Sequence, residues 1–350
     1  MENQKSKIKN QKLFITGAQV AVQACIDAGA QMMYGYPITP GTEVFTGWIE
    51  AQKNYLQTED EIAAGFAVCG AVIAGQKAFT ATAGPGHTLM QDGFSMAEGM
   101  RLPFVEIIAQ RGGPSSGTVI YSQQEVILAC LGGNGEGMRI VYSPANLDEV
   151  YELTRHTFNN AWKYRFPSIL LTDGYMLKTR GIVDFSKFAN LKNVDSYPLI
   201  KEGEAKHWRN IYTFEEELYN ELQNQKKDFE QVRNEIAVAE EFETADAEVL
   251  LIAHGLVASA CKQAVGELKL QGKKIGLWRP ITLRPMDVKS LNKTVAKVKQ
   301  VLIVESSLGQ LARLIKDELD PELKVKITYL QKPAMGIEVE EIVDRINNIL

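Results

Sequence analysis

Short apolar runs of strand length alternate with longer helical patterns along most of this chain, and this alternation limits the possible folds most strongly. The runs AFTAT (78–82), FVEIIA (104–109) and VLIVE (301–305) are each bounded by glycine, proline or polar residues. Helical patterns lie between such runs, for example at 60–75 and 146–164. Strands joined by helices of this length form mostly parallel sheets that are covered by helices on both faces. The sequence therefore predicts a doubly wound α/β fold, in which ligands bind beyond the carboxyl ends of the strands.

A long polar stretch divides the alternating pattern into two parts, and 350 residues also favour two domains. We predict a polar N-terminal tail over 1–12, a first mostly parallel-sheet domain over 13–182, a polar helical connector over 183–245, and a second such domain over 246–350. Most positions between 215 and 242 are polar or charged, with a thin apolar stripe. This pattern indicates a connector helix with a solvated outer face. A helix that contacts a partner protein is the alternative.

Composition argues against several classes of function. The formal net charge is −5 and the isoelectric point is about 5.6, which disfavours binding to nucleic acids or to anionic membrane surfaces. The apolar stretch 62–75, which has no charged residue, is shorter than the roughly 18 residues that a membrane span needs. The first 12 residues do not resemble a signal peptide. Four scattered cysteines favour a reducing cytoplasm over a disulfide framework or a zinc site.

Two loops and one acidic residue are expected at the same edge of the first sheet. The segment YPITPGTE (36–43) follows a predicted strand, and its two prolines make the loop rigid. The turn AGPG (83–86) follows another strand. Glu61 opens an apolar helix between them. Considered alone, Glu61 is a first-turn acid that complements the helix dipole, with Thr58 as the cap and Glu61 as its capping-box partner. Its position between the two loops favours a role in a binding site.

Arg111 directly follows the buried strand at 104–109, within the loop QRGGPSSGT (110–118). Glycines and serines let backbone amides approach a ligand, and a guanidinium group binds a carboxylate through two hydrogen bonds. Thr39 has a hydroxyl group that is available to the same carboxylate. An ordinary surface arginine is the alternative. Taken together, the two residues predict an anionic organic acid as the ligand.

Other polar motifs are less informative. His87 follows the Gly-Pro-Gly turn, where contact with a ligand and capping of the helix are equally plausible. His254 is predicted to be structural, and the glycine-rich segment 132–137 is predicted to be a flexible loop. The sequence contains neither a strict GxGxxG motif after a strand nor a P-loop, so nicotinamide-dependent and P-loop functions lack their phosphate site.

Six motifs together resemble the alpha-type subunits of the 2-oxoacid:ferredoxin oxidoreductases. In the first predicted domain they are YPITPGTE (36–43), EDEIAA (59–64), TATAGPGHTLM (80–90) and QRGGPSSGT (110–118). In the second they are RPITLRPMD (279–287) and VESSLGQL (304–311). The resemblance covers nearly the whole chain except the tail and the connector. It implies a thiamine-diphosphate pyrimidine-binding domain followed by a transketolase C-terminal-like domain.

The resemblance also implies roles for particular residues. Glu61 would be the catalytic acid that hydrogen-bonds N1′ of the aminopyrimidine ring, with Glu59 as the alternative if the register differs. Thr39 and Arg111 would bind the carboxylate of the substrate. The remaining cofactor contacts would come from the two loops, at Tyr36, Pro37, Ile38, Gly84, Pro85 and Gly86.

The implied reaction is the oxidative decarboxylation of a 2-oxoacid with coenzyme A, which gives acyl-CoA, CO2 and reduced ferredoxin. The chain has no Gly-Asp-Gly segment for Mg2+ and no cysteine motif for a [4Fe-4S] cluster. No metal ligand is therefore predicted on this chain. A beta-type partner subunit is expected to supply the diphosphate site, Mg2+ and the cluster, with gamma and delta subunits as further possible members.

The chain is expected to be inactive alone and to work in the cytoplasm. Among the possible substrates, 2-oxoglutarate and branched-chain 2-oxoacids are favoured. Two alternatives remain open. One is the beta subunit of a lipoamide-linked 2-oxoacid dehydrogenase, and the other is a non-catalytic assembly subunit.

Overall fold

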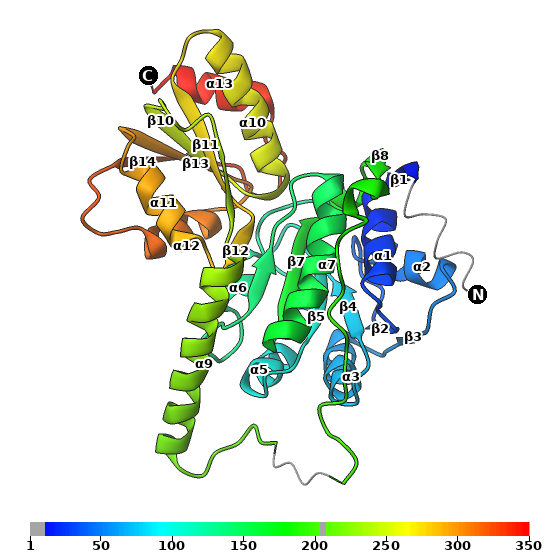
Figure 1. Ribbon diagram of the computed structural model, residues 1–350. Helices are drawn as coiled ribbons and strands as arrows, with labels where there is room; N and C mark the ends of the chain where they lie inside the picture. Colours follow the sequence, from blue (N-terminus) through cyan, green and yellow to red (C-terminus); the bar gives the residue numbers. More distant parts are fainter. Residues whose placement is uncertain (1–10, 204–207, 350) are drawn as a thin grey trace.

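The larger of the two main sheets has seven strands. Their order is β12 (Thr282–Arg284), β6 (Ile140–Tyr142), β7 (Ser168–Asp173), β5 (Val105–Gln110), β4 (Ala78–Thr82), β2 (Met32–Gly35) and β3 (Tyr55–Gln57). Neighbouring strands are parallel except for β12, which is antiparallel to β6. The protein is represented here by a computed structural model, which describes residues 11–203 and 208–349 (Figure 1).

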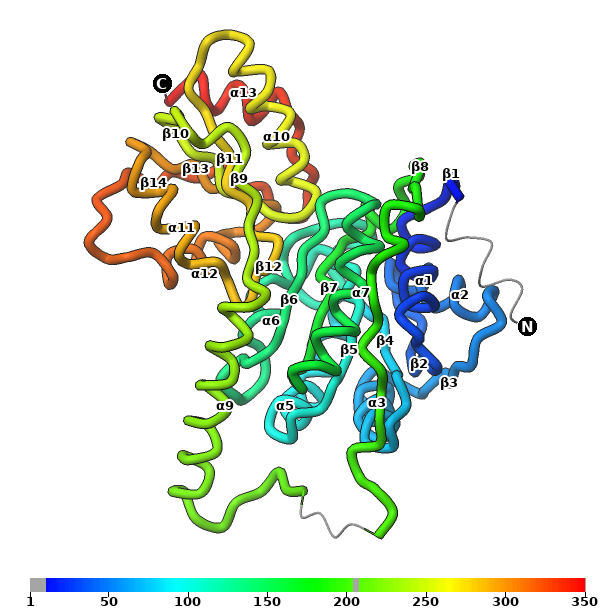
Figure 2. The backbone as a smooth tube through the Cα atoms, in the orientation of Figure 1, coloured from blue at the N-terminus to red at the C-terminus, as the bar shows by residue number. Residues whose placement is uncertain are grey.

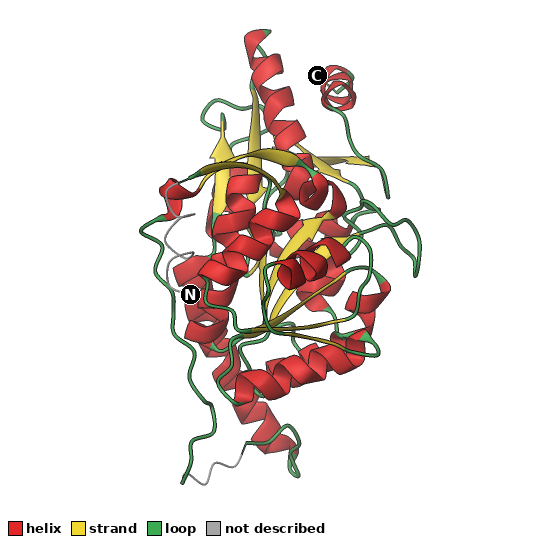
Figure 3. Cartoon of the chain, turned by 90° about the vertical axis from the view of Figure 1, so that its right-hand side faces the viewer, coloured by secondary structure: helices red, strands yellow, loops and turns green. Residues whose placement is uncertain are grey.

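Helices cover both faces of this sheet, as Figure 3 shows. One face packs against α1 (Gly17–Asp27), α2 (Thr42–Glu50) and α7 (Leu147–Tyr164). The other packs against α3 (Glu61–Ile73), α5 (Gln91–Gly99) and α6 (Val126–Leu131), and the short helix α4 (Pro85–Leu89) contacts α3 and α5. Alternate strand residues point to opposite faces, so Phe79 joins the first core and Ala78 the second. The predicted doubly wound α/β fold is confirmed.

The second sheet has five strands. Their order is β14 (Lys326–Gln331), β13 (Gln300–Glu305), β10 (Val249–Ile252), β11 (Ile275–Pro280) and β9 (Ala239–Phe242). Only the edge strand β9 is antiparallel to its neighbour. Helices α10 (Gly255–Leu270) and α13 (Val339–Asn347) cover one face, while α11 (Val288–Val295) and α12 (Gln310–Glu318) lie on the other. Buried residues of that second face, such as Trp278, continue the core of the first domain, so the two domains share an apolar interface.

Two short strands connect the predicted domains in an unexpected way. Strand β9 lies within the predicted connector but joins the second sheet, whereas β12 lies within the predicted second domain but joins the first sheet. At the start of the chain, β1 (Lys12–Thr16) pairs with β8 (Arg180–Asp184), so the two ends of the first domain meet. Between β7 and the connector lie α8 (Gly174–Lys178) and the short 3-10 helix η1 (Phe185–Phe188). The predicted domain limits remain a prediction.

The connector runs along the first domain and returns as one long helix, α9 (Glu215–Ile236) (Figure 2). Phe229 and Val232 on this helix are buried against the first domain. Arg233 Nη1 donates a hydrogen bond of 3.1 Å to the carbonyl of Met286 in the second domain. These two residues of the apolar stripe thus pack against the chain itself, whereas Leu218, nearer the start of the helix, is exposed. None of the helices in the described ranges is long and apolar enough to cross a membrane.

Local contacts set the bounds of two helical segments. The segment after the Gly-Pro-Gly turn is interrupted at Met90, which separates α4 from α5. Helix α1 begins at Gly17, because Thr16 caps it by accepting a hydrogen bond from the amide of Gln19. The preceding residues form β1.

Candidate active site

Three of the predicted site segments meet at the carboxyl-end edge of the larger sheet. Strands β2, β4 and β5 are neighbours or near neighbours, and each is followed by one of the loops identified in the sequence. Helix α3 begins at the same edge after β3. The parallel arrangement therefore places the loops at 36–41, 83–84 and 111–118 beside the N-terminus of α3.

Glu61 is the first residue of α3, but it does not cap this helix. Asp60 is the N-cap, and its carboxylate accepts a hydrogen bond of 2.8 Å from the amide of Ala63. The hydroxyl of Thr58 donates to the carbonyl of Asp60 instead. The prediction of a capping box between Thr58 and Glu61 is therefore wrong. Because Asp60 satisfies the helix terminus, the carboxyl group of Glu61 is left for another role.

The carboxyl group of Glu61 lies in a confined space against Gly86. The side chain of Glu61 is 4% exposed. A Cβ atom added to Gly86 would lie 2.5 Å from Glu61 Oε1 and 2.2 Å from Thr82 Oγ1, so only glycine fits there. Burial raises the pKa of Glu61 above its ordinary value, and the charge of Asp60 adds to this effect. Hydrogen bonding to its own backbone and the positive charge of Arg111 oppose it.

Arg111 lies across Gly84 and contacts the first loop. Its Nη1 donates a hydrogen bond of 2.8 Å to the carbonyl oxygen of Thr39, so the two predicted substrate residues are adjacent. A Cβ atom at Gly84, where φ is +53°, would lie 2.7 Å from Arg111 Nε. Arg111 is 6% exposed, and its Nε is buried without a hydrogen-bond partner in the described part of the chain. A buried donor of this kind suits an anionic ligand.

The other predicted loop residues surround this group. Tyr36 is 39% exposed at the edge of the sheet, and Pro37 is half-buried. Ile38 packs against the first core, and its carbonyl accepts a hydrogen bond of 2.9 Å from the amide of Thr42 at the start of α2. Pro85 occupies the first turn of α4, which needs no amide donor at that position.

Glu125 belongs to this group, although sequence reasoning did not identify it. Its Oε1 accepts hydrogen bonds of 3.0 Å from the amides of Gly84 and Arg111. Its Oε2 lies 3.0 Å from Nδ1 of His87, whose ring is fully buried. One carboxylate thus joins the Gly-Pro-Gly turn, the arginine loop and the histidine. The local sequence SQQEVIL contains no motif that indicates this role.

The two remaining sequence motifs lie elsewhere. The prediction that His254 is structural agrees with its complete burial and with its Nδ1, which lies 2.9 Å from Ser143 Oγ. Burial, together with the nearby charge of Arg279, lowers the pKa of His254 to about 3. The segment 132–137 is held in place, because the carbonyl of Gly132 accepts a hydrogen bond of 2.7 Å from Arg139.

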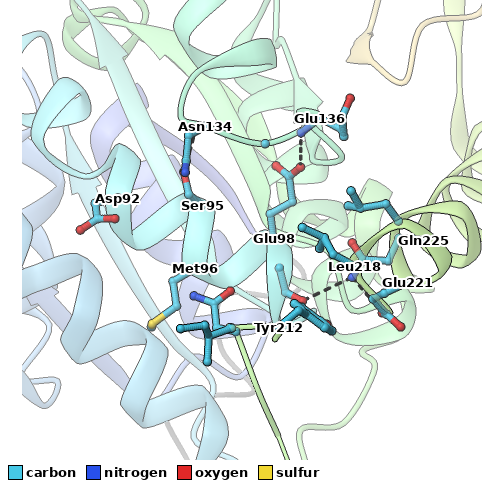
Figure 4. Close-up of a pocket in the computed structure, with 15 residues that line it drawn as sticks. Asp92, Ser95, Met96, Glu98, Asn134, Glu136, Tyr212, Leu218, Glu221 and Gln225 are labelled. Atoms are coloured by element: carbon cyan, nitrogen blue, oxygen red, sulfur yellow. Dashed lines mark hydrogen bonds between the residues drawn. The ribbon is translucent and has the colours of Figure 1, made fainter. Parts of the chain in front are cut away.

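A separate cavity of about 520 Å3 lies between α5, the segment 132–137 and the start of α9 (Figure 4). Its lining includes Asp92, Glu98 and Gln225 and none of the site residues described above. The carboxylate of Glu98 is already used by the amide of Glu136, at 3.0 Å, and by Arg139. Within the described residues, no group of three or more histidine, cysteine or acidic side chains is placed to hold a metal ion.

Comparison with protein families agrees with both halves of the structure. Residues 23–250 match the thiamine-diphosphate-binding domain of pyruvate flavodoxin/ferredoxin oxidoreductases. Residues 247–342 match core domain II of pyruvate:ferredoxin oxidoreductase. The two matches together span most of the chain.

Individual relatives give the same result. The chain is 31% identical over 329 residues to the 2-oxoglutarate synthase subunit KorA of Methanocaldococcus jannaschii. This alignment covers 85% of the chain and 89% of KorA. It is also 31% identical over 315 residues to the ketoisovalerate oxidoreductase subunit VorB of Methanothermobacter marburgensis, with 86% and 88% covered.

Solved structures extend the comparison to the fold. The 2-oxoglutarate:ferredoxin oxidoreductase of Magnetococcus marinus, solved with 2-oxoglutarate, coenzyme A and succinyl-CoA bound, matches with a TM-score of 0.89 and 25% identity. The match covers 97% of this chain but 65% of that one. A split-gene transketolase, in an inactive beta4 tetramer, matches with a TM-score of 0.62 and 12% identity, which shows a likeness of fold alone. The chain therefore belongs to the pyruvate flavodoxin/ferredoxin oxidoreductase family, as an alpha-type chain of the 2-oxoacid:ferredoxin oxidoreductases.

Proposed function

We propose that this chain is the alpha-type subunit of an enzyme that oxidatively decarboxylates a 2-oxoacid with coenzyme A and ferredoxin. The observation that carries this proposal is the grouping of Glu61, Gly86, Arg111 and Thr39 at one edge of the sheet. A buried carboxyl group with a raised pKa lies beside a buried guanidinium group that has an unused donor. An acid and an anion-binding donor side by side suit chemistry on a carboxylate substrate.

The residues present fit the aminopyrimidine half of thiamine diphosphate. Only glycine fits at position 86, because a Cβ atom there would collide with Glu61 Oε1, so the carboxyl group and this turn are in direct contact. When bound, this cofactor supplies the carbon nucleophile that attacks the 2-oxo group and accepts electrons as CO2 leaves. Glu61 would hold the ring at N1′, and its raised pKa lets it give and take a proton there. Tyr36, Pro37, Ile38, Gly84 and Pro85 would form the surrounding wall.

Arg111 and Thr39 are proposed to bind the substrate carboxylate. The hydrogen bond from Arg111 Nη1 to the carbonyl of Thr39 fixes one edge of the guanidinium group, and Nε, buried against Gly84, has no hydrogen-bond partner in the described part of the chain. Curated relatives carry the names of 2-oxoglutarate and ketoisovalerate enzymes, which support the same two favoured substrate classes. The chemistry common to both is a carboxylate next to a ketone.

Partner subunits are proposed to complete the site. We place Mg2+, the diphosphate site and an iron–sulfur cluster on a beta-type subunit, with gamma and delta subunits as further possible members and a cytoplasmic location. The outer face of α3 supports a partner at this edge, because Ile62 and Phe66 on it are 40% and 36% exposed. Exposed apolar side chains grouped on one helix face are typical of an interaction surface.

The proposal is tested by co-expressing the chain with candidate beta-type subunits and purifying the complex. We expect reduction of a low-potential dye that depends on coenzyme A, thiamine diphosphate and a 2-oxoacid from a panel containing 2-oxoglutarate and branched-chain acids. The isolated chain should show no turnover. Activity without thiamine diphosphate, or full activity from the isolated chain, would contradict the proposal.

Replacement of Gly86 by alanine should disrupt the proposed cofactor site. The new Cβ would displace Glu61 and Thr82, so we expect at least about a tenfold loss of thiamine-dependent activity, since small displacements in active sites are costly. Gly266→Ala is the matched control, because it lies within α10 and a Cβ there meets nothing within 4 Å. Normal activity of the Gly86 variant would remove this turn from the site.

A further inference from the structure

Segment 123–127 of the first domain lies against the carboxyl-end edge of the second sheet. In the second domain, His254 lies just beyond the end of β10, and Ser306 follows the adjacent strand β13. Ligands of parallel sheets usually bind at such an edge. Here the edge contacts the chain itself.

Three polar groups of Gln123 form hydrogen bonds with these two strand ends. Its side-chain amide donates a hydrogen bond of 2.9 Å to the carbonyl of His254. Its side-chain oxygen accepts one of 3.0 Å from the amide of Ser306, and its own amide donates to the carbonyl of Ser306 at 3.1 Å. Gln123 is 1% exposed, so these bonds are protected from water.

Gln310, from the motif VESSLGQL, holds the same segment one turn further along. Its Nε2 donates a hydrogen bond of 2.6 Å to the carbonyl of Gln124. Its Oε1 accepts one of 3.0 Å from the amide of Ile127. Glu125 lies between these two bonded residues, so the second domain fixes its backbone on both sides.

Glu125 in turn fixes the site. Its Oε1 holds the amides of Gly84 and Arg111 together, and its Oε2 meets Nδ1 of His87. Gly84 and Arg111 are the residues whose close approach sets the direction of the arginine side chain. We propose that Glu125 is a positioning residue of the active site, and that the second domain controls the geometry of this site by holding the backbone before Glu125, at Gln123 and Gln124, and after it, at Ile127.

This inference rests on the proposed function for the meaning of the site, but its main test does not require activity. Hydrogen exchange of the full chain, read at the amides of Gly84 and Arg111, reports directly on their bonds to Glu125. Glu125→Ala should accelerate exchange at both amides by about tenfold or more, because each loses its acceptor. Glu125→Gln keeps a side-chain oxygen for both amides and should restore slow exchange.

The Glu125→Gln variant also tests the contact with His87. A carboxylate opposite Nδ1 requires that atom to carry the proton, whereas the amide group of glutamine favours the tautomer with the proton on Nε2. Nitrogen NMR of histidine-labelled protein should therefore show a change of tautomer at His87 alone among the four histidines. An unchanged tautomer would contradict the proposed pairing, and this measurement needs no substrate.

The contribution of the second domain is tested with two neighbouring glutamines. Gln123→Leu removes the side-chain bonds to His254 and Ser306, and we expect exchange at Gly84 and Arg111 to rise by about threefold or more. Gln124→Leu is the control, because it keeps the main-chain carbonyl that accepts the bond from Gln310 and loses a bond with Ser122 Oγ, which does not cross the domain boundary. Equal exchange in the two variants would overturn the role of the second domain.

Kinetics of the assembled complex separate this inference from the proposed function. Glu125→Ala should raise the KM for the 2-oxoacid by about tenfold or more through Arg111, with Glu125→Gln within about threefold of the wild type. Unchanged exchange in Glu125→Ala, or faster exchange with an unchanged KM, would overturn the positioning role. A complex that turns over without thiamine diphosphate would instead contradict the proposed function and leave the exchange result intact.

Discussion

Replacing Glu61 by glutamine should lower kcat of the assembled enzyme by about 10²- to 10⁴-fold, which is the usual contribution of a positioned acid or base. Glutamine keeps the size and hydrogen-bonding capacity of the side chain but cannot give or take a proton. The carboxyl group is buried, its pKa is raised, and it packs closely against Gly86. The loss should therefore appear in kcat, while the affinity of the subunits for one another stays unchanged. Steady-state rates and size-exclusion chromatography of the same preparations measure both.

The matched control is Glu59→Gln, two residues earlier in the same acidic segment. Glu59 is exposed, whereas Glu61 is almost fully buried, so the structure favours Glu61 over the alternative register. The Glu59 variant should retain wild-type rates. A large loss of rate in the Glu59 variant with normal rates in the Glu61 variant would reverse this assignment.

The pH dependence of stability gives an independent check on the environment of Glu61. Burial raises the folded-state pKa above the ordinary value of 4.5. The neutral carboxyl group therefore contributes its full stabilisation of the folded state when the pH is below that ordinary value. This stabilisation is lost as the pH rises through the raised pKa. Glutamine does not ionise, so the Tm of Glu61→Gln relative to the wild type should increase across this pH window. Thermal melts of both proteins at a series of pH values measure the difference, and a constant difference would contradict a raised pKa.

The sequence was most informative where local pattern and burial agree. Strands β4, β5 and β13 are apolar over nearly their whole length because helices cover both faces of each sheet, and all three were predicted close to their observed bounds. The adjacency of the loops that contain Thr39 and Arg111 was also predicted. It follows from the parallel sheet, which places the ends of its strands at one edge.

Other features depend on contacts that the local sequence does not show. Glu125 lies 41 residues from Gly84 and 14 from Arg111, so only the folded sheet reveals that it joins them. Strands β9 and β12 are short and pair across the domain boundary, which their composition does not indicate. The cap of α3 falls on Asp60 rather than Thr58 because the backbone of Asp60 is extended and its carboxylate reaches Ala63. These are differences of register and tertiary contact, not of propensity.

Replacing Arg111 by alanine should lower kcat/KM for the 2-oxoacid by about 10²- to 10⁴-fold, mainly through a higher KM. Charge-assisted bonds to a carboxylate contribute about 1.5–3 kcal/mol each, and two are removed together. The vacated space also releases the carbonyl of Thr39, which now accepts a hydrogen bond from Arg111 Nη1. The measurement is a substrate titration of the assembled complex at saturating coenzyme A.

Two further variants show whether geometry or charge is responsible. Arg111→Lys keeps the positive charge but cannot both hold Thr39 and present a planar pair of donors, so its kcat/KM should lie between those of the wild type and the alanine variant. Arg313→Ala, on the exposed face of α12, is the control and should leave the KM unchanged. If Arg111→Ala also leaves the KM unchanged, the guanidinium group does not bind the substrate carboxylate. If lysine restores full activity, charge alone is sufficient, and the fixed orientation of Arg111 over Gly84 has no catalytic importance.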